Sequence, residues 1–345
     1  MGKILNEEAL TFGDVLLRPA YSNVESRSNV NLNVDINSQF TFKNPLIPAN
    51  MKSIISEEMA IEIVKLQGLG FMHRFVSFED QVTIIENILK IDFGYNPMNY
   101  FGVSVGVKPE DNINIEKFYE LGVKIFCIDI AHGHSLACGQ MCKLIKSNFK
   151  NSLVVAGNVA TADGAKYLWD SGADIVKVGI GASGICTTRL KAGAGVPQLS
   201  AIKEIYDFKS NNHDYMYKKF ISDGGIRVVG DCVKALAFAD MVMMGNAFAG
   251  CEETPEEVME IDGQKYKKYA GSSTHKTRHI EGVISLVHTK GKFKDIIDEY
   301  CQGIKSGCSY AGATNLSELK YLARFVKTTP ASQAESATHD VKVIG

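Results

Sequence analysis

Short apolar runs recur along the chain, and each of them ends in a small or polar residue. There are eight such runs, at residues 45–50, 70–73, 101–106, 124–129, 152–157, 174–179, 219–224 and 240–245. Their near-continuous apolar character predicts strands of a parallel sheet that is buried on both faces. Stretches with helical spacing separate them, at residues 57–66, 78–89, 115–121, 138–148, 163–171, 199–208 and 229–238.

This alternation of strand and helix is typical of α/β proteins. Eight strand–helix units over ~200 residues favour a (β/α)₈ TIM barrel. An open doubly wound sheet usually has fewer strands and a GxGxxG turn after its first strand. Because no such turn follows residues 45–50, the sequence predicts a single barrel domain that spans residues 1–345.

Two segments depart from the repeat. Residues 250–293 are polar and have little helical periodicity, which predicts a long mobile flap, since loops of this length are typically lids or binding loops. The alternative is a tolerated insertion of β-ribbon character. Residues 294–327 return to helical spacing and are expected to close the barrel, whereas residues 331–345 are expected to form an extended tail.

The composition narrows the possible partners and locations. Of the 345 residues, 45% are hydrophobic and 22% are charged, which is enough for one large core. A net charge of −2 creates no basic field, so nucleic acid is not expected as a partner. The first residues contain no long apolar run, which argues against a signal peptide or a membrane span and predicts a cytoplasmic protein. The eight cysteines have neither CxxC nor zinc-ligand spacing, so free thiols are expected.

Polar or glycine residues stand at the ends of the predicted strands. They are Asn50, His73, Arg74, Ser104, Asp129, Asn158, Asp223, Gly224, Gly225, Gly245 and Asn246. A single one of them could cap the helix that follows. Because the carboxyl ends of barrel strands meet on one face, the whole set predicts one shared pocket.

The most reactive group is expected to be Cys186. It follows a glycine-rich turn and precedes two threonines and Arg189. Gly179, Gly181 and Gly184 allow the backbone to turn sharply and to present N–H groups to an anion. Such surroundings favour a thiolate and therefore a nucleophile. The alternative is a tight loop that holds a small buried cysteine.

Twelve segments identify a family. They are LTFGDVLLRP (10–19), ESRSNV (25–30), IPANM (47–51), MHRF (72–75), SVGVK (104–108), IDIAHGHS (128–135), AGNVAT (156–161), GADIVKVGIG (172–181), CTTR (186–189), ISDGGIR (221–227), YAGSS (269–273) and SYAGAT (309–314). Through these segments, and over almost its full length, the chain resembles the IMP dehydrogenase and GMP reductase family. The resemblance implies a homotetrameric barrel that binds a purine 5′-monophosphate and a nicotinamide dinucleotide, with a cysteine attached to C2 of the purine during turnover.

The family has two activities, and the resemblance favours one of them. One activity oxidises IMP to XMP with NAD⁺, and the other converts GMP to IMP with NADPH and releases ammonia. No paired regulatory (CBS) domain interrupts residues 89–101. The chain also resembles bacterial reductases in three segments, which are MHRF, IDIAHGHS, and PANM followed by SIISEEMA. Arg278 in STHKTRH is not followed by the tyrosine expected of a dehydrogenase, and Glu281 stands where a reductase pairs a glutamate with Thr188. NADPH-dependent reductive deamination of GMP is therefore expected.

Three departures keep alternatives open. GGIR (224–227) and the tail segment AESATHD (334–340) resemble the dehydrogenase, which makes IMP oxidation the alternative activity. The loop before the cysteine reads Ala182, Ser183 and Gly184 where the family has GPGS, which leaves a nucleotide-binding barrel without turnover as a third reading.

Roles of individual residues follow from the resemblance. Cys186 is expected to be the nucleophile, with Thr188 and Glu281 as a proton relay. Asp223 is expected to accept hydrogen bonds from the ribose hydroxyls. Backbone donors to the phosphate are expected at Gly224, Gly225, Gly245 and Asn246. Further contacts with the nucleotide are expected at Ala270, Gly271, Ser272, Arg278 and Gly282.

The resemblance also implies a cofactor site and a cation site. NADPH is expected to contact Ser26, Arg27, Arg74, Asp129, Ile130, Ala131, Ile180, Gly181, Tyr310, Ala311, Gly312 and Ala313. A potassium ion is expected on the backbone carbonyls of Gly181, Ser183 and Cys186, completed by the tail of a neighbouring subunit near Glu335 and Ser336.

Overall fold

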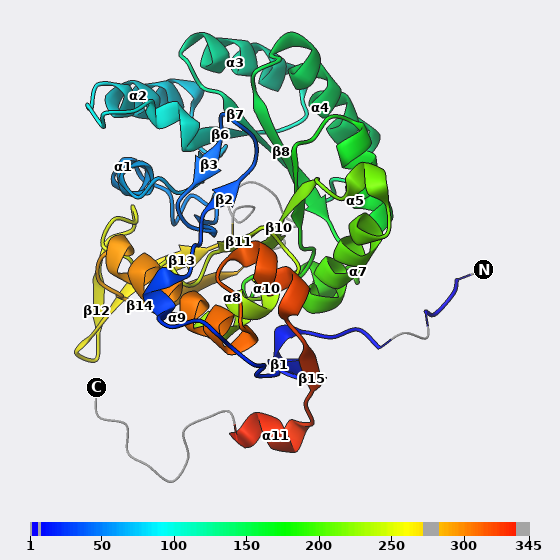
Figure 1. Cartoon of the computed structure of the whole chain (residues 1–345). Helices are drawn as coiled ribbons and strands as arrows, with labels where there is room; N and C mark the ends of the chain where they lie inside the picture. The colour runs from blue at the N-terminus through cyan, green and yellow to red at the C-terminus, as the bar shows by residue number, and fades with distance from the viewer. Residues whose placement is uncertain (1, 6–7, 272–282, 336–345) are drawn as a thin grey trace.

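Eight parallel strands form the central sheet of the computed structural model (Figure 1), which describes residues 2–5, 8–271 and 283–335. Their order in the sheet is β4, β11, β10, β9, β8, β7, β6, β5. The strands are β4 (Leu46–Pro48), β5 (Gly70–Met72), β6 (Phe101–Val105), β7 (Ile125–Asp129), β8 (Leu153–Val159), β9 (Ile175–Val178), β10 (Lys219–Asp223) and β11 (Met241–Met244). All eight predicted strands are confirmed, and with the surrounding helices they form a nearly closed (β/α)₈ barrel.

Helices cover the outside of this barrel (Figure 1). They are α1 (Glu57–Lys65), α2 (Phe78–Leu89), α3 (Pro109–Glu120), α4 (Leu136–Asn148), α5 (Ala162–Asp170), α7 (Gln198–Ser210), α8 (Val229–Leu236), α9 (Phe293–Ala311) and α10 (Leu316–Leu322). Side-chain N-caps begin several of them, for example Ser56, Ser77 and Thr161. Helix α3 begins six residues before the predicted start, because its first turn is polar and shows no apolar period.

The sheet is buried on both faces, as its apolar strands predict. Every residue of β6, β9 and β11 is buried, and the surrounding helices contribute Met59, Ile85, Ile145 and Leu168 to the same core. The one charged residue in these three strands is Lys177 on β9, which is only 2% exposed. A buried cation requires partners, and these lie at the carboxyl ends of β10, the next strand, and β7, two strands away.

Several short elements were not predicted by the apolar pattern. Strand β1 (Val15–Leu17) pairs antiparallel with β15 (Phe325–Lys327), and β2 (Val34–Asp35) pairs with β3 (Thr41–Phe42). Among the described residues, 3₁₀ helices also connect longer elements, namely η1 (Phe12–Asp14), η2 (Arg27–Asn29), η3 (Pro97–Asn99) and η4 (His213–Tyr215). Between α2 and β6 the chain contains only a connection with η3, in agreement with the predicted absence of an inserted domain.

The predicted flap contains a small antiparallel sheet. Its strands are β12 (Met259–Ile261), β13 (Gln264–Ala270) and β14 (Ile284–His288). The described part of residues 250–293 therefore has β-ribbon character, and a role of this segment as a lid or binding loop stays a prediction. Lys267 on β13 fixes this sheet to the start of the same segment, because its Nζ donates to the carbonyls of Cys251 at 2.8 Å and Glu252 at 2.9 Å.

The expectation of an extended tail is wrong where the structure describes it. Residues Pro330–Glu335 form a short helix, α11. Proline suits the first helical position, and Thr329 and Ser332 exchange backbone-to-hydroxyl hydrogen bonds that stabilise the first turn. Residues 336–345 lie outside the described part of the chain.

Two further expectations concern cysteines and membranes. All eight cysteines are free thiols, as their spacing predicts. Within the described residues, no helix combines the length and apolar character that a membrane span needs.

Gly102 offers a test of how tightly the barrel strands pack. A Cβ added there would lie 2.3 Å from the carbonyl oxygen of Ile125 on β7. The backbone conformation of Gly102 is one that other residues also adopt, so the contact with Ile125 is the main obstacle to a side chain. We expect Gly102→Ala to lower the free energy of unfolding by about 1–3 kcal/mol, the usual cost of overpacking. Gly230→Ala is the matched control, because that exposed glycine in α8 has nothing within 4 Å of an added Cβ. Urea denaturation measures both, and equal stability of the two variants would contradict this packing.

Candidate active site

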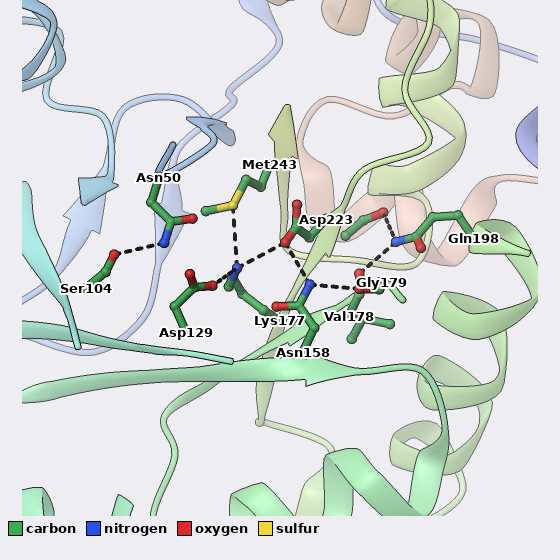
Figure 2. Close-up of polar contacts among 11 residues, drawn as sticks. Asn50, Ser104, Asp129, Asn158, Lys177, Val178, Gly179, Gln198, Asp223 and Met243 are labelled. Carbon is green, nitrogen blue, oxygen red and sulfur yellow. Dashed lines mark hydrogen bonds and ion pairs between the residues drawn. The ribbon is translucent and has the colours of Figure 1, made fainter. Parts of the chain in front are cut away.

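The carboxyl ends of three strands converge on the side chain of Lys177 (Figure 2). Its Nζ lies 3.0 Å from Oδ1 of Asp129, the last residue of β7, and 3.0 Å from Oδ2 of Asp223, the last residue of β10. Burial by itself would lower the pKa of Lys177, but the two carboxylates outweigh burial and raise it above its ordinary value. Lys177 is therefore a permanent positive charge between two carboxylates.

Amide and hydroxyl groups complete this network. Asn158 Nδ2 donates to Oδ2 of Asp223 and to the Gly179 carbonyl, both at 2.8 Å (Figure 2). Asn50 Nδ2 donates to Ser104 Oγ at 2.8 Å. These strand-end residues do lie together at one end of the barrel, whereas a shared pocket between them stays a prediction.

Asp129 is held in its charged form. Burial opposes ionisation, but Lys177, Arg74 and a hydrogen bond from Asn50 together keep the pKa of Asp129 below its ordinary value. The side chain remains 22% exposed. The carboxylate can therefore accept hydrogen bonds from a ligand at neutral pH.

The cysteine loop follows β9. Cys186 Sγ lies 3.1 Å from Thr188 Oγ1, and the Cys186 N–H donates to the Ser183 carbonyl at 3.1 Å. Thr188 begins the short helix α6 (Thr188–Lys191). The sequence suggests that Arg189 stabilises a thiolate, but its Nη2 donates to the Val196 carbonyl at 3.0 Å, so the guanidinium braces the loop instead.

Glycines bring this loop close to Asp223. Gly224 has a φ of +90°, and a Cβ there would lie 3.3 Å from the backbone nitrogen of Ser183. A side chain at Gly224 would therefore push the cysteine loop away from the end of β10. The Gly224 N–H is predicted to bind phosphate, yet it donates to the Met243 carbonyl at 3.1 Å and is already engaged.

Gly245 and Asn246, two of the other predicted phosphate donors, lie on a turn after β11. The Gly245 carbonyl accepts from Phe248 and Ala249, both at 3.1 Å, so a helical turn starts here and its first N–H groups are available to an anion. Gly225 has a φ of +81° and packs against Gln198. Lys290 reaches the turn through its bond to the Asn246 carbonyl, at 2.5 Å.

Tyr269 is a site residue that sequence reasoning missed. It is 3% exposed on β13, and a Cβ on Gly245 would lie 2.1 Å from its hydroxyl oxygen. Burial raises the pKa of Tyr269 to about 12, although a hydrogen bond with Ser183 acts in the opposite direction. Tyr269 thus joins the flap, the cysteine loop and the turn after β11. The segment YAGSS contains it, but its apolar spacing resembles that of an ordinary strand residue.

The base of the flap meets the cysteine loop directly. The Gly271 N–H donates to the Val283 carbonyl, and the Val283 N–H donates to the carbonyl of Ile185, both at 3.2 Å. Ala270 exchanges hydrogen bonds with the hydroxyl of Ser53. Four predicted site residues lie outside the described part of the chain, namely Ser272, Arg278, Glu281 and Gly282.

The predicted cofactor residues form two groups. The first group follows the ends of β5, β7 and β9 and consists of Arg74, Ile130, Ala131, Ile180 and Gly181. The guanidinium of Arg27 lies 5.8 Å from the ring centre of Tyr310, and Gly312 ends α9 with a φ of +78°, close to the carbonyl of Tyr21. Within the described residues no hydrogen bond or ion pair joins this second group to Asp129, and its binding to the same cofactor stays a prediction.

Comparison with known proteins identifies the family. A model described as the IMP dehydrogenase / GMP reductase domain matches residues 9–339. GMP reductase of Staphylococcus epidermidis is 38% identical over 318 residues, which cover 90% of this chain and 93% of that protein. IMP dehydrogenase of Borreliella burgdorferi is 34% identical over 402 residues, which cover 98% of each.

A solved structure agrees. A GMP reductase variant from Trypanosoma brucei, in complex with guanosine 5′-monophosphate, superposes with a TM-score of 0.88 at 27% identity, covering 97% of this chain and 98% of that one. The chain belongs to the IMP dehydrogenase / GMP reductase family. It is an oxidoreductase that acts on purine nucleotides.

Gly245 and Tyr269 should be coupled in a double-mutant cycle. Gly245→Ala places a methyl group against the Tyr269 hydroxyl, and we expect it to cost about 1–3 kcal/mol of folding free energy. In the double variant with Tyr269→Phe the hydroxyl is gone and the ring carbon Cζ, 3.2 Å from the added Cβ, is the nearest atom of that ring. The double variant should therefore recover at least ~0.5 kcal/mol relative to additivity. Denaturant unfolding of all four proteins measures the coupling, and strict additivity would show that these residues do not touch.

Proposed function

We propose that the protein is a GMP reductase, which converts GMP to IMP with NADPH and releases ammonia. The observation that carries the proposal is the Cys186–Thr188 pair at 3.1 Å, on a loop that packs against Gly224 beside Asp223. This arrangement supports a site in which a nucleophile, a hydroxyl and a ribose acceptor surround one ligand. The relatives named GMP reductase, 38% identical, support the same activity.

The nucleotide is positioned by groups of opposite character. Asp223 is a carboxylate that suits the ribose diol, and one of its oxygens is already fixed by Lys177 and Asn158. The turn at Gly245 and Asn246 offers backbone N–H groups to the phosphate. Holding both ends of the nucleotide places the purine ring over the cysteine loop.

Covalent chemistry then follows at C2 of the purine. The Cys186 thiolate adds to C2, a C–S bond forms, and the bond from C2 to the exocyclic nitrogen breaks. That nitrogen must take up a proton to leave as ammonia. The Thr188 hydroxyl can deliver the proton and recover it from Glu281, which we propose as its partner and which lies outside the described residues, two positions before Val283.

The residues near Asp129 fit a nicotinamide dinucleotide. Asp129 is charged, partly exposed and able to accept from a ribose diol, and Arg74 supplies a nearby positive charge. NADPH, when bound, supplies the hydride that replaces the sulfur at C2. The ends of β7 and β9 supply the remaining residues of this half of the proposed site, which are Ile130, Ala131, Ile180 and Gly181.

A potassium ion and a tetramer are further parts of the proposal. Ser183 and Cys186 lie on one turn, and we propose that their carbonyls and that of Gly181 hold the ion. A potassium ion binds several oxygens, so a tail from a neighbouring subunit in a homotetramer would complete the shell. A cytoplasmic location also belongs to this proposal.

IMP dehydrogenase is the second candidate. The Borreliella burgdorferi relative matches 98% of the chain, so the match reaches close to both chain ends. It would use the same cysteine but would form the adduct from IMP by loss of hydride. The two activities therefore differ in whether the nicotinamide cofactor is oxidised, as with GMP, or reduced, as with IMP.

Absorbance at 340 nm should decide between them. With GMP and NADPH we expect NADPH to be consumed, with one ammonia and one IMP formed for each NADPH, because the hydride replaces the amino group. IMP with NAD⁺ in the absence of GMP is the control reaction. NADH formation there without GMP-dependent oxidation would identify a dehydrogenase, and nucleotide binding without turnover of either pair would leave a non-catalytic barrel.

A further inference from the structure

Lys177 has no part in the proposed chemistry, yet it is the most deeply buried charge in the site. Its side chain is 3% exposed, and its Nζ contacts Asp129, Asp223 and, at 3.9 Å, Met243 Sδ. The neighbouring thiol of Cys127 is neutral, because burial raises its pKa far above the ordinary value. The two carboxylates are therefore the negative partners that hold this ammonium in the barrel.

The register of the sheet makes this contact possible. Asp129 on β7 is level with Gly157 on β8, and Gly157 is level with Lys177 on β9. A Cβ on Gly157 would lie 2.6 Å from the Cβ of Lys177. Because glycine has no side chain, the middle strand leaves a gap in this row, and the lysine reaches across it to Asp129.

The two carboxylates serve different ligands in the proposed function. Asp223 lies beside Gly224 and the cysteine loop, where the nucleotide is proposed to bind. Asp129 lies at the end of β7 with Arg74 nearby, where the dinucleotide is proposed to bind. One lysine thus contacts one acceptor from each half of the site.

Each carboxylate is held by one of its oxygens. Lys177 and Asn158 both donate to Oδ2 of Asp223, at 3.0 and 2.8 Å. Lys177 donates to Oδ1 of Asp129 at 3.0 Å. Within the described residues no hydrogen bond uses the second oxygen of Asp223, which is therefore available to a ligand.

We infer that Lys177 is a positioning residue that orients Asp129 and Asp223 together and so couples the nucleotide half of the site to the dinucleotide half. The inference rests on the proposed function, because it assigns one ligand to each carboxylate. Without the ammonium, two carboxylates would face each other across a buried gap, and their repulsion would turn both away from their ligands.

The test compares the affinities of the two ligands in the full-length protein. IMP is titrated alone by calorimetry, and NADPH is titrated by fluorescence into protein saturated with IMP, a pair between which no hydride transfer is possible. Lys177→Met should weaken the binding of both ligands by about tenfold or more, since coupled buried contacts are typically worth this much.

The matched control is Lys209→Met. Lys209 is also a buried lysine, but it lies on α7 and donates to the carbonyl of Lys218, which precedes β10 at the opposite end of the barrel from Asp223. Its loss should reduce stability while leaving both affinities within about twofold. A merely structural role of Lys177 predicts that the two variants behave alike.

A second variant covers the case in which Lys177→Met does not fold. Asp129→Asn preserves the side-chain shape and weakens the hold of Asp129 on Lys177, so the ammonium binds Asp223 more strongly and competes with the ribose. IMP should then bind several-fold more weakly, although Asp129 is proposed to contact only the dinucleotide. Unchanged IMP affinity in this variant would overturn the inference.

The outcomes separate the inference from the proposed function. Weaker binding of both ligands by Lys177→Met, with the control unaffected, supports the coupling. Loss of affinity for only one ligand, or for neither, overturns it while the proposed function stands. If the wild-type protein binds neither IMP nor NADPH, the proposed function fails and the inference fails with it.

Discussion

The parallel register of β7, β8, β9 and β10 sets where the charged groups of the site lie. Parallel strands present all their carboxyl ends on one side, so Asp129 and Asp223 come to the same rim from segments far apart in sequence. Two partly buried carboxylates this close would repel each other, and the ammonium of Lys177 between them removes that repulsion. Because Gly157 on β8 has no side chain, the ammonium can reach past that strand to Asp129 on β7.

The cysteine loop and the flap are attached to the strand ends of the barrel. The cysteine loop packs against the end of β10 because Gly224 leaves space for Ser183, and the flap attaches to the loop through the bond from Val283 to Ile185. Tyr269 adds a second attachment between flap and rim, and Lys267 joins the flap sheet to the first residues of the flap segment. Loop, flap and strand ends are therefore positioned relative to one another by a few specific contacts.

The sequence predicted the barrel well, because strands buried on both faces are apolar throughout and stand out from the helices between them. The strand-end residues Asp129, Asn158 and Asp223 could also be placed, since a parallel barrel brings such positions together. Lys177 could not be recognised, because one lysine in an apolar strand gives no signal until the strand register shows its two partners. Contacts between segments far apart in the sequence could not be predicted either, because the apolar pattern carries no information on which segments pair. Examples are β1 with β15 and Tyr269 with Gly245.

The central claim is that Cys186 displaces the amino group at C2 of GMP before any hydride arrives. The most direct measurement mixes the protein with GMP alone, without NADPH, quenches the mixture with acid, and quantifies ammonia together with the mass of the peptide that contains Cys186. The account predicts ammonia in an amount limited by the number of protein chains, a nucleotide adduct on Cys186, and neither product with Cys186→Ala. Equal ammonia release by Cys186→Ala, or an adduct that forms only from IMP with NAD⁺, would contradict it.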